Sequence, residues 1–139
     1  MSKKGLPRGV RYNNPLNIRE GQNDPNHWQG EHLLDLDEGY EEFTAPKWGF
    51  RAAARILRNY QRFYGYNSLR ELITRFAPKN ENDTDNYISF VSKRLDVSPD
   101  APLPLSDDQF MSRMLHTMSI MEVGRYFTLE DAAEGVALA

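Results

Sequence analysis

The pattern of apolar residues changes at Lys47, and this change constrains the fold more than any other feature of the chain. Residues 1–46 are rich in Gly, Pro, Asn and Asp and hold no lasting helical period, which is typical of loops. From Lys47 onward, apolar residues recur at spacings of three and four, the pattern of one helix face. They are Phe50, Ala53, Ala54, Leu57, Tyr60 and Tyr64. The sequence therefore predicts a loop-rich first third, residues 1–46, followed by a helical region, residues 47–139.

Capping signals mark the ends of further helices. The first helix should stop at Gly65, because glycine favours helix C-termini. Ser68 stands three residues before Glu71 and forms a capping-box pattern with it, while Ser106 and Thr128 are the expected N-caps of two later helices. Together with the apolar spacing, these signals predict four more helices, at 69–76, 84–95, 107–123 and 129–138.

The fold class that follows is a mainly α domain. Two short strands are expected within residues 28–43, where a β-hairpin would give the domain a small α+β character. A length of 139 residues suits one domain, and the proline-rich stretch 96–104 is expected to be a loop inside it. We therefore predict a single domain over residues 1–139.

Some kinds of chemistry are excluded or made improbable by the residues that the chain lacks. It has no cysteine, so a disulfide scaffold, a thiol nucleophile and a cysteine-ligated metal are excluded. His27, His32 and His116 lie in unlike contexts without ligand spacing, so we expect no metal and no cofactor. No apolar run approaches the ~20 residues of a membrane span, and residues 1–5 lack a secretory apolar segment. We therefore expect neither membrane insertion nor a signal peptide.

Charge is nearly balanced overall but is unevenly placed. The 17 basic and 20 acidic residues give a net charge of −3, which does not favour nucleic-acid binding. Residues 1–19 hold five bases and no acid, whereas residues 31–42 hold six acids and neither Lys nor Arg. Four arginines share one face of the first predicted helix, which is either a solvated face or a surface for DNA or an acidic partner. They are Arg51, Arg55, Arg58 and Arg62.

Carboxylates are the remaining candidates for catalysis. Glu122 falls on the last turn of a predicted amphipathic helix, where burial and the negative helix end would both raise its pKa. A carboxylic acid that stays neutral is what a general acid for glycosidic cleavage requires. The alternative is an ordinary exposed acid near a helix end. Glu20, Glu81 and Asp83 are the candidate second carboxylates, although Asp83 is equally suited to cap a helix.

The first third also offers groups that suit a sugar ligand. Amide and guanidinium donors match hydroxyl and N-acetyl groups, although asparagine in a turn often serves the turn itself. The polar candidates are Asn13, Asn14, Asn17 and Arg19. Trp28 and Phe43 belong to an aromatic cluster that would either stack on sugar rings or seal the core beneath the loops.

Several stretches of the sequence resemble a known family. They are RGVRYNNPLNIR (8–19), WQG (28–30), Phe43, GFRA (49–52), APKNENDT (77–84), Tyr87, Glu122, Gly124 and EGVA (134–137). In this order they resemble small tailed-phage and prophage proteins that are virion-associated, lysozyme-like and degrade peptidoglycan. The resemblance covers residues 8–139 and implies a lysozyme-like helical domain.

A second resemblance concerns the mechanism. Lytic transglycosylases carry their single catalytic Glu at the end of a helix, and an Asn-Asn segment follows later in their chains. Here the order is reversed, with Asn13 and Asn14 near the start and Glu122 near the end, which implies a circularly permuted lysozyme-like fold. The resemblance implies a lytic transglycosylase or muramidase that cleaves the MurNAc–GlcNAc strand with Glu122 as its acid. Asn13, Asn14, Asn17 and Arg19 would orient N-acetyl and lactyl groups, and Trp28 and Phe43 would form the walls of the site.

The family resemblance also implies where the protein acts. It would reach peptidoglycan strands from a phage virion or from the host cytoplasm, and would act in the bacterial periplasm or cell wall. Other virion proteins are further expected partners. Two alternatives stay open: a non-enzymatic virion component whose arginine stripe contacts DNA or an acidic partner, and a peptidoglycan-binding module without turnover.

Overall fold

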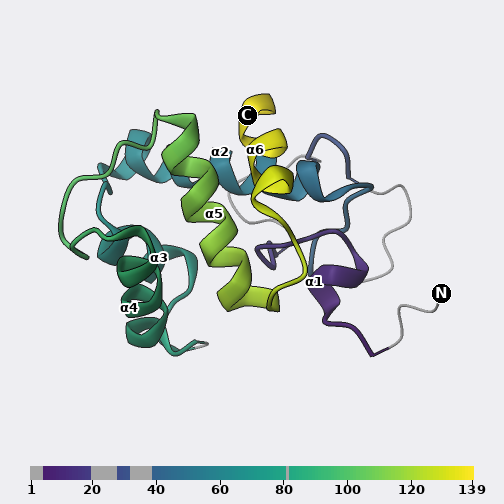
Figure 1. Cartoon of the computed structure of the whole chain (residues 1–139), viewed down its shortest axis with the longest axis horizontal. Coiled ribbons are helices and arrows are strands. Elements are labelled where there is room, and N and C mark those ends of the chain that lie inside the picture. Colours follow the sequence, from purple (N-terminus) through teal and green to yellow (C-terminus); the bar gives the residue numbers. More distant parts are fainter. Residues whose placement is uncertain (1–4, 20–27, 32–38, 81) are drawn as a thin grey trace.

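Helices joined by loops form the regular structure of the described chain (Figure 1). A computed structural model describes residues 5–19, 28–31, 39–80 and 82–139. The helices are α1 (Arg8–Arg11), α2 (Pro46–Tyr64), α3 (Leu69–Phe76), α4 (Thr84–Leu95), α5 (Asp108–Val123) and α6 (Leu129–Leu138). The five helices predicted after residue 46 are confirmed to within about one residue at each end, a margin at which helix boundaries are commonly ambiguous. The short α1 was not predicted.

The hairpin predicted within residues 28–43 is wrong for the part of that segment that the structure describes. There, no strand forms, and pairing is limited to isolated antiparallel bridges between Arg19 and Tyr40 and between Glu31 and Phe43. Residues 32–38 lie outside the described chain. The mainly α class therefore holds, and in the described part of this segment the two bridges stand in place of strands.

Two asparagine side chains explain why the first third stays irregular. The Asn14 amide nitrogen donates to the carbonyl oxygens of Ile18 and Glu41, both at 2.9 Å, and its oxygen accepts from Ile18 N at 2.9 Å. The Asn13 amide donates to Phe43 O at 3.2 Å. These side chains satisfy backbone groups that a strand ladder would otherwise pair.

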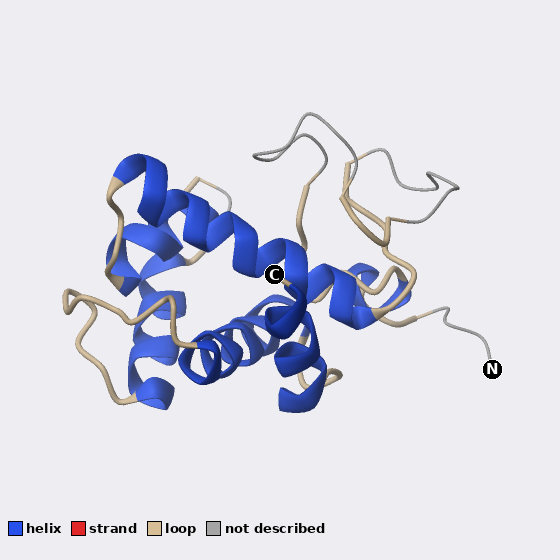
Figure 2. Ribbon diagram, turned by 90° about the horizontal axis from the view of Figure 1, so that it is seen from above, coloured by secondary structure: helices blue, strands red, loops and turns tan. Residues whose placement is uncertain are grey.

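The core is organised around α2, and α6 packs along it (Figures 1 and 2). The buried face of α2 includes Phe50, Leu57 and Tyr60, as their spacing predicts. Gly135 permits the close approach of α6, because a Cβ there would lie 2.5 Å from Phe50 Cβ and 2.6 Å from Lys47 O. α5 contacts α2, α4 and α6, so it joins the α3–α4 pair to the rest of the fold. Within the described residues, no helix is long and apolar enough to cross a membrane.

Hydrogen bonds at the helix starts confirm two expected caps and correct a third. The Ser68 side chain accepts a backbone N–H of the first turn of α3, and Thr128 forms a complete capping box with Asp131 at the start of α6. For α5 the cap is Asp107 rather than Ser106, because the Asp107 carboxylate accepts two backbone N–H groups of the first turn. A carboxylate beside the positive end of a helix is also favoured electrostatically.

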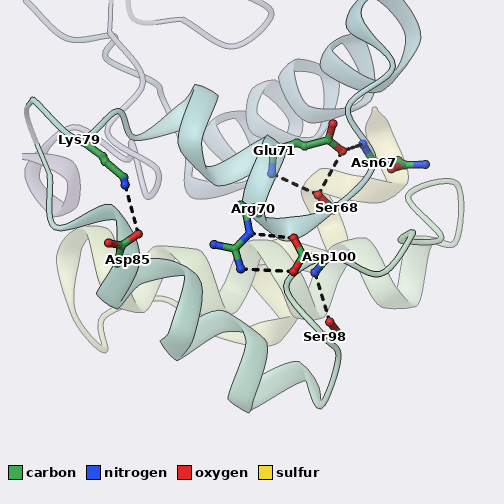
Figure 3. Close-up of polar contacts among 8 residues, drawn as sticks. All are labelled: Asn67, Ser68, Arg70, Glu71, Lys79, Asp85, Ser98 and Asp100. Atoms are coloured by element: carbon green, nitrogen blue, oxygen red, sulfur yellow. Dashed lines mark hydrogen bonds and ion pairs between the residues drawn. The ribbon is translucent and has the colours of Figure 1, made fainter.

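Two ion pairs fix the loops around α3 and α4 (Figure 3). The Arg70 guanidinium donates to both Asp100 carboxylate oxygens, at 2.8 and 3.3 Å, and ties the 96–107 loop to α3. Lys79 Nζ lies 3.6 Å from Asp85 Oδ1 and joins the α3–α4 turn to the first turn of α4. These side chains are largely exposed, so the pairs position the loops more than they stabilise the fold.

Candidate functional site

Glu122 lies on the last turn of α5, where the sequence placed it, and there it meets the N-terminal third of the chain. The Asn17 amide nitrogen donates to Glu122 Oε1 at 3.1 Å and to the Glu122 backbone oxygen at 3.2 Å. The two residues are 105 positions apart in the sequence. The fold therefore brings the Asn-rich segment and the helix-end Glu into direct contact despite their reversed order.

Tyr87, which the sequence singled out only within the family resemblance, approaches the same carboxyl group from α4. Its side chain is buried, and its hydroxyl has no hydrogen-bond partner of ordinary geometry among the described residues. Burial raises the pKa of the Tyr87 phenol well above its usual value, and the neighbouring Glu122 charge raises it further. A neutral phenol therefore lies beside Glu122.

The pKa of Glu122 is set by opposing influences. Burial is the largest and raises the pKa of the carboxyl group above its usual value. The polar groups of Asn17 and Tyr87, followed by the positive charge of Arg19, lower it without cancelling the rise. The Glu122 side chain remains half-buried rather than fully enclosed. The site thus holds an acid that is partly dehydrated and still reaches solvent.

A glycine allows α1 to approach the end of α5. A Cβ on Gly9 would lie 2.5 Å from Val123 Cγ1 and 2.9 Å from Asn17 Oδ1, and it would also meet the Asn14 backbone oxygen. Any side chain at this position would push α1 away from both neighbours at once. The contact between Asn17 and Glu122 therefore depends on the absence of a side chain at residue 9.

The asparagines of the first third have different roles. Asn13 and Asn17 both adopt a left-handed backbone, with φ of 54° and 50°, which asparagine tolerates better than most residues. Of the two, Asn17 turns its amide to Glu122, whereas the Asn13 amide holds the Phe43 backbone. Asn14 is 1% exposed and its amide is used inside the turn. This burial favours the alternative in which Asn14 serves the turn itself, and a substrate contact by Asn14 stays a prediction.

The aromatic residues expected to line a sugar site are buried. Trp28 is 6% exposed and Phe43 is 2% exposed, and both belong to the hydrophobic core. Their burial favours the second interpretation of the cluster, in which these rings seal the core beneath the loops. Arg19, in contrast, is exposed, and its guanidinium lies 5.6 Å from the centre of the Tyr40 ring.

The structure leaves the second carboxylate unassigned. Asp83 caps α4 through a 3.2 Å bond from a backbone N–H of the first turn, while Glu20 and Glu81 lie outside the described residues. Glu41 and Glu42 are 5% and 4% exposed, and no sequence pattern predicted their burial, because they belong to the acid-rich stretch. No cluster of three metal-ligating side chains occurs in the described parts of the chain.

The arginine stripe of α2 is divided between two roles. Arg51 and Arg58 donate to backbone carbonyls at the end of α6 and before α5, at 3.3 and 3.0 Å. Arg58 also pairs with Asp108 at 3.0 Å. Arg55 and Arg62 are exposed. Half of the stripe therefore holds neighbouring segments against α2, which weakens its interpretation as a continuous DNA-facing surface.

The sequence is similar to a phage protein over most of its length. It is 43% identical over 129 residues to Protein P5 of Pseudoalteromonas phage PM2, a match that covers 92% of this chain and 79% of that protein. The chain belongs to the P5 family. No protein-family model matches it. Membership of the P5 family supports the expected association with bacteriophage, whereas the name P5 specifies neither a substrate nor a reaction.

Proposed function

We propose that this P5-family protein is a peptidoglycan-degrading glycosidase with Glu122 as its general acid and base. The observation that carries the proposal is the contact between Asn17 and Glu122, which joins the two segments that resemble lytic transglycosylases. Burial raises the pKa of Glu122, as a proton donor to a glycosidic oxygen requires. A circularly permuted lysozyme-like fold is part of the same proposal, and this contact supports it.

In the proposed mechanism, neutral Glu122 donates its proton to the oxygen between MurNAc and GlcNAc as that bond breaks. Asn17 holds Oε1, so the proton resides on the other carboxyl oxygen. The resulting carboxylate then takes the proton of the C6 hydroxyl, whose oxygen closes onto the anomeric carbon and forms the 1,6-anhydro product. This route needs one carboxylate, whereas hydrolysis needs a second to activate water. Asp83 is engaged as the cap of α4, so Glu20 and Glu81 are the remaining candidates for that second acid.

Arg19 is the proposed contact for the polar substituents of the substrate. It is exposed, and its charge acts on Glu122, so an N-acetyl or lactyl group beside the cleaved bond would lie within its reach. The protein would be delivered by the phage particle and act in the periplasm or cell wall. Other virion proteins would be its partners there.

The test is digestion of purified peptidoglycan by the wild type and by Glu122→Gln, followed by mass spectrometry of the soluble products. Anhydro-muropeptides from the wild type and none from the variant are the expected result. Reducing-end products lost in the variant would instead identify a muramidase. Equal products from both proteins would remove Glu122 from the mechanism.

A non-enzymatic role in the phage particle is the second candidate function. Similarity to a phage protein over most of the chain favours it. Recovery of the protein in purified particles, together with no soluble products from the wild type, would support this role over the enzymatic one.

A further inference from the structure

A hollow of about 680 Å³ lies against α3 and α4, outside the site around Glu122. Its lining includes Tyr66, Arg70, Arg75, Lys79, Asp85 and Ile88. A second hollow of about 370 Å³ shares Arg70, Asp85 and Ile88 and extends the first along α4 toward Lys93. Neither is lined by the residues that contact Glu122. The larger volume is typical of ligand-binding clefts.

The walls of this hollow are held in place by contacts within the protein (Figure 3). Arg70 is oriented by its two bonds to Asp100 in the neighbouring loop, and Lys79 Nζ lies 3.6 Å from Asp85 Oδ1. These exposed pairs orient the basic side chains along the walls without holding them rigidly.

An aromatic surface adjoins the hollow at the end of α2. The rings of Tyr64 and Tyr66 lie 5.5 Å apart, and the Arg75 guanidinium lies 5.0 Å from the centre of the Tyr64 ring. Tyr64 is 51% exposed and the adjacent Phe63 is 67% exposed. Tyr66 and Arg75 line the hollow itself, and Tyr64 extends the aromatic surface beside them.

The charge of the lining favours an anionic ligand. Arg70, Arg75 and Lys79 line the larger hollow with Glu71 and Asp85, and Asp100, which pairs with Arg70, balances the third base. The smaller hollow adds Lys93, so the two hollows together carry one net positive charge in a chain whose net charge is −3. Fixed positive charge in a concave surface attracts ligands of opposite sign.

We propose that this hollow is a second binding site, separate from Glu122, for a carboxylate-bearing segment of a glycan strand. The inference rests on the proposed function, because a polymeric substrate can extend beyond the place where it is cut. The C–H faces of sugar rings would pack on the tyrosines. The hydroxyl groups at the ring edges would hydrogen-bond to the ion-paired side chains. Free carboxylates on such a strand, including those of its peptide stems, suit the Arg75 guanidinium, which lies 5.0 Å from the centre of the Tyr64 ring.

The test measures binding in a Glu122→Gln background, so that the strand is not cleaved. Arg75→Glu is compared with Arg113→Glu, which makes the same charge change at an exposed arginine of another hollow, about 400 Å³ in volume. Binding is measured by co-sedimentation with purified peptidoglycan and by titration with soluble carboxylate-bearing glycan fragments and neutral GlcNAc oligomers. Thermal unfolding checks that each variant is folded, and Tyr64→Ala carries the test if Arg75→Glu does not fold.

We expect Arg75→Glu to bind peptidoglycan about tenfold more weakly than the background protein, the effect of one lost charge-assisted contact. Its preference for carboxylate-bearing over neutral fragments should fall as well, while Arg113→Glu retains both properties. Unchanged binding by Arg75→Glu, or an equal loss in Arg113→Glu, overturns the second site even if the wild type digests peptidoglycan. A wild type that neither digests nor binds peptidoglycan overturns the proposed function together with the second site.

Discussion

Replacing Asn17 by glycine would isolate the contribution of one amide to the acidity of Glu122. Asn17 has a φ of 50°, which glycine adopts without strain, so the substitution removes the side chain while keeping the backbone. The amide lost is the one that donates to Glu122 Oε1 at 3.1 Å. Because this bond favours the charged form, its loss should raise the pKa of Glu122 further.

The magnitude follows from the geometry of that bond. A hydrogen bond to a charged group contributes about 1.5–3 kcal/mol, and both side chains are half-buried, which favours the lower end of the range. About 1.4 kcal/mol corresponds to a tenfold change in an ionisation constant. We therefore expect the ionisation constant of Glu122 to fall about tenfold in Asn17→Gly.

The assay is a carbon-13 NMR titration of the glutamate carboxyl groups, with the Glu122 signal assigned by its loss in Glu122→Gln. Asn13→Gly is the matched control, because Asn13 has a similar φ of 54° but donates to the Phe43 backbone instead. The alkaline limb of peptidoglycan cleavage should move to higher pH in Asn17→Gly and stay in place in the control. An unchanged Glu122 titration in Asn17→Gly, or an equal change in Asn13→Gly, would refute the reasoning.

Three further predictions follow from the same site. Folding raises the pKa of Glu122, so ionisation of this group destabilises the wild-type protein as the pH rises above the pKa of an unfolded glutamate. Glu122→Gln should therefore melt at a higher temperature than the wild type at pH 8, and the difference should vanish near pH 4. A difference in melting temperature that stays constant with pH in calorimetry would contradict this. Gly9→Ala should destabilise the protein by about 1–3 kcal/mol, because the new Cβ would lie 2.5 Å from Val123 Cγ1; urea unfolding with no loss of stability would show that α1 moves without cost. Tyr87→Phe removes a buried hydroxyl whose polar group lowers the pKa of Glu122, so the carbon-13 titration of Glu122 should move to higher pH, and an unchanged titration would show that the phenol does not act on that carboxyl group.

The sequence by itself determined the helices and the choice of Glu122. Apolar spacing and caps act over a few residues, so the boundaries of α3, α4 and α6 could be predicted directly. An acid on the last turn of an amphipathic helix was also visible as a local pattern. The start of α5 was misassigned by one residue because Ser106 and Asp107 are both good caps, and side-chain geometry decided between them.

Only the tertiary structure decided which groups surround Glu122. Asn17 reaches it across 105 residues of sequence, and Tyr87 reaches it from α4. The same packing buried Trp28 and turned the Asn14 amide inward, which no local pattern could show. Helix periodicity is set by neighbours three and four residues away, whereas burial and long-range hydrogen bonds depend on which surfaces meet when the whole chain packs.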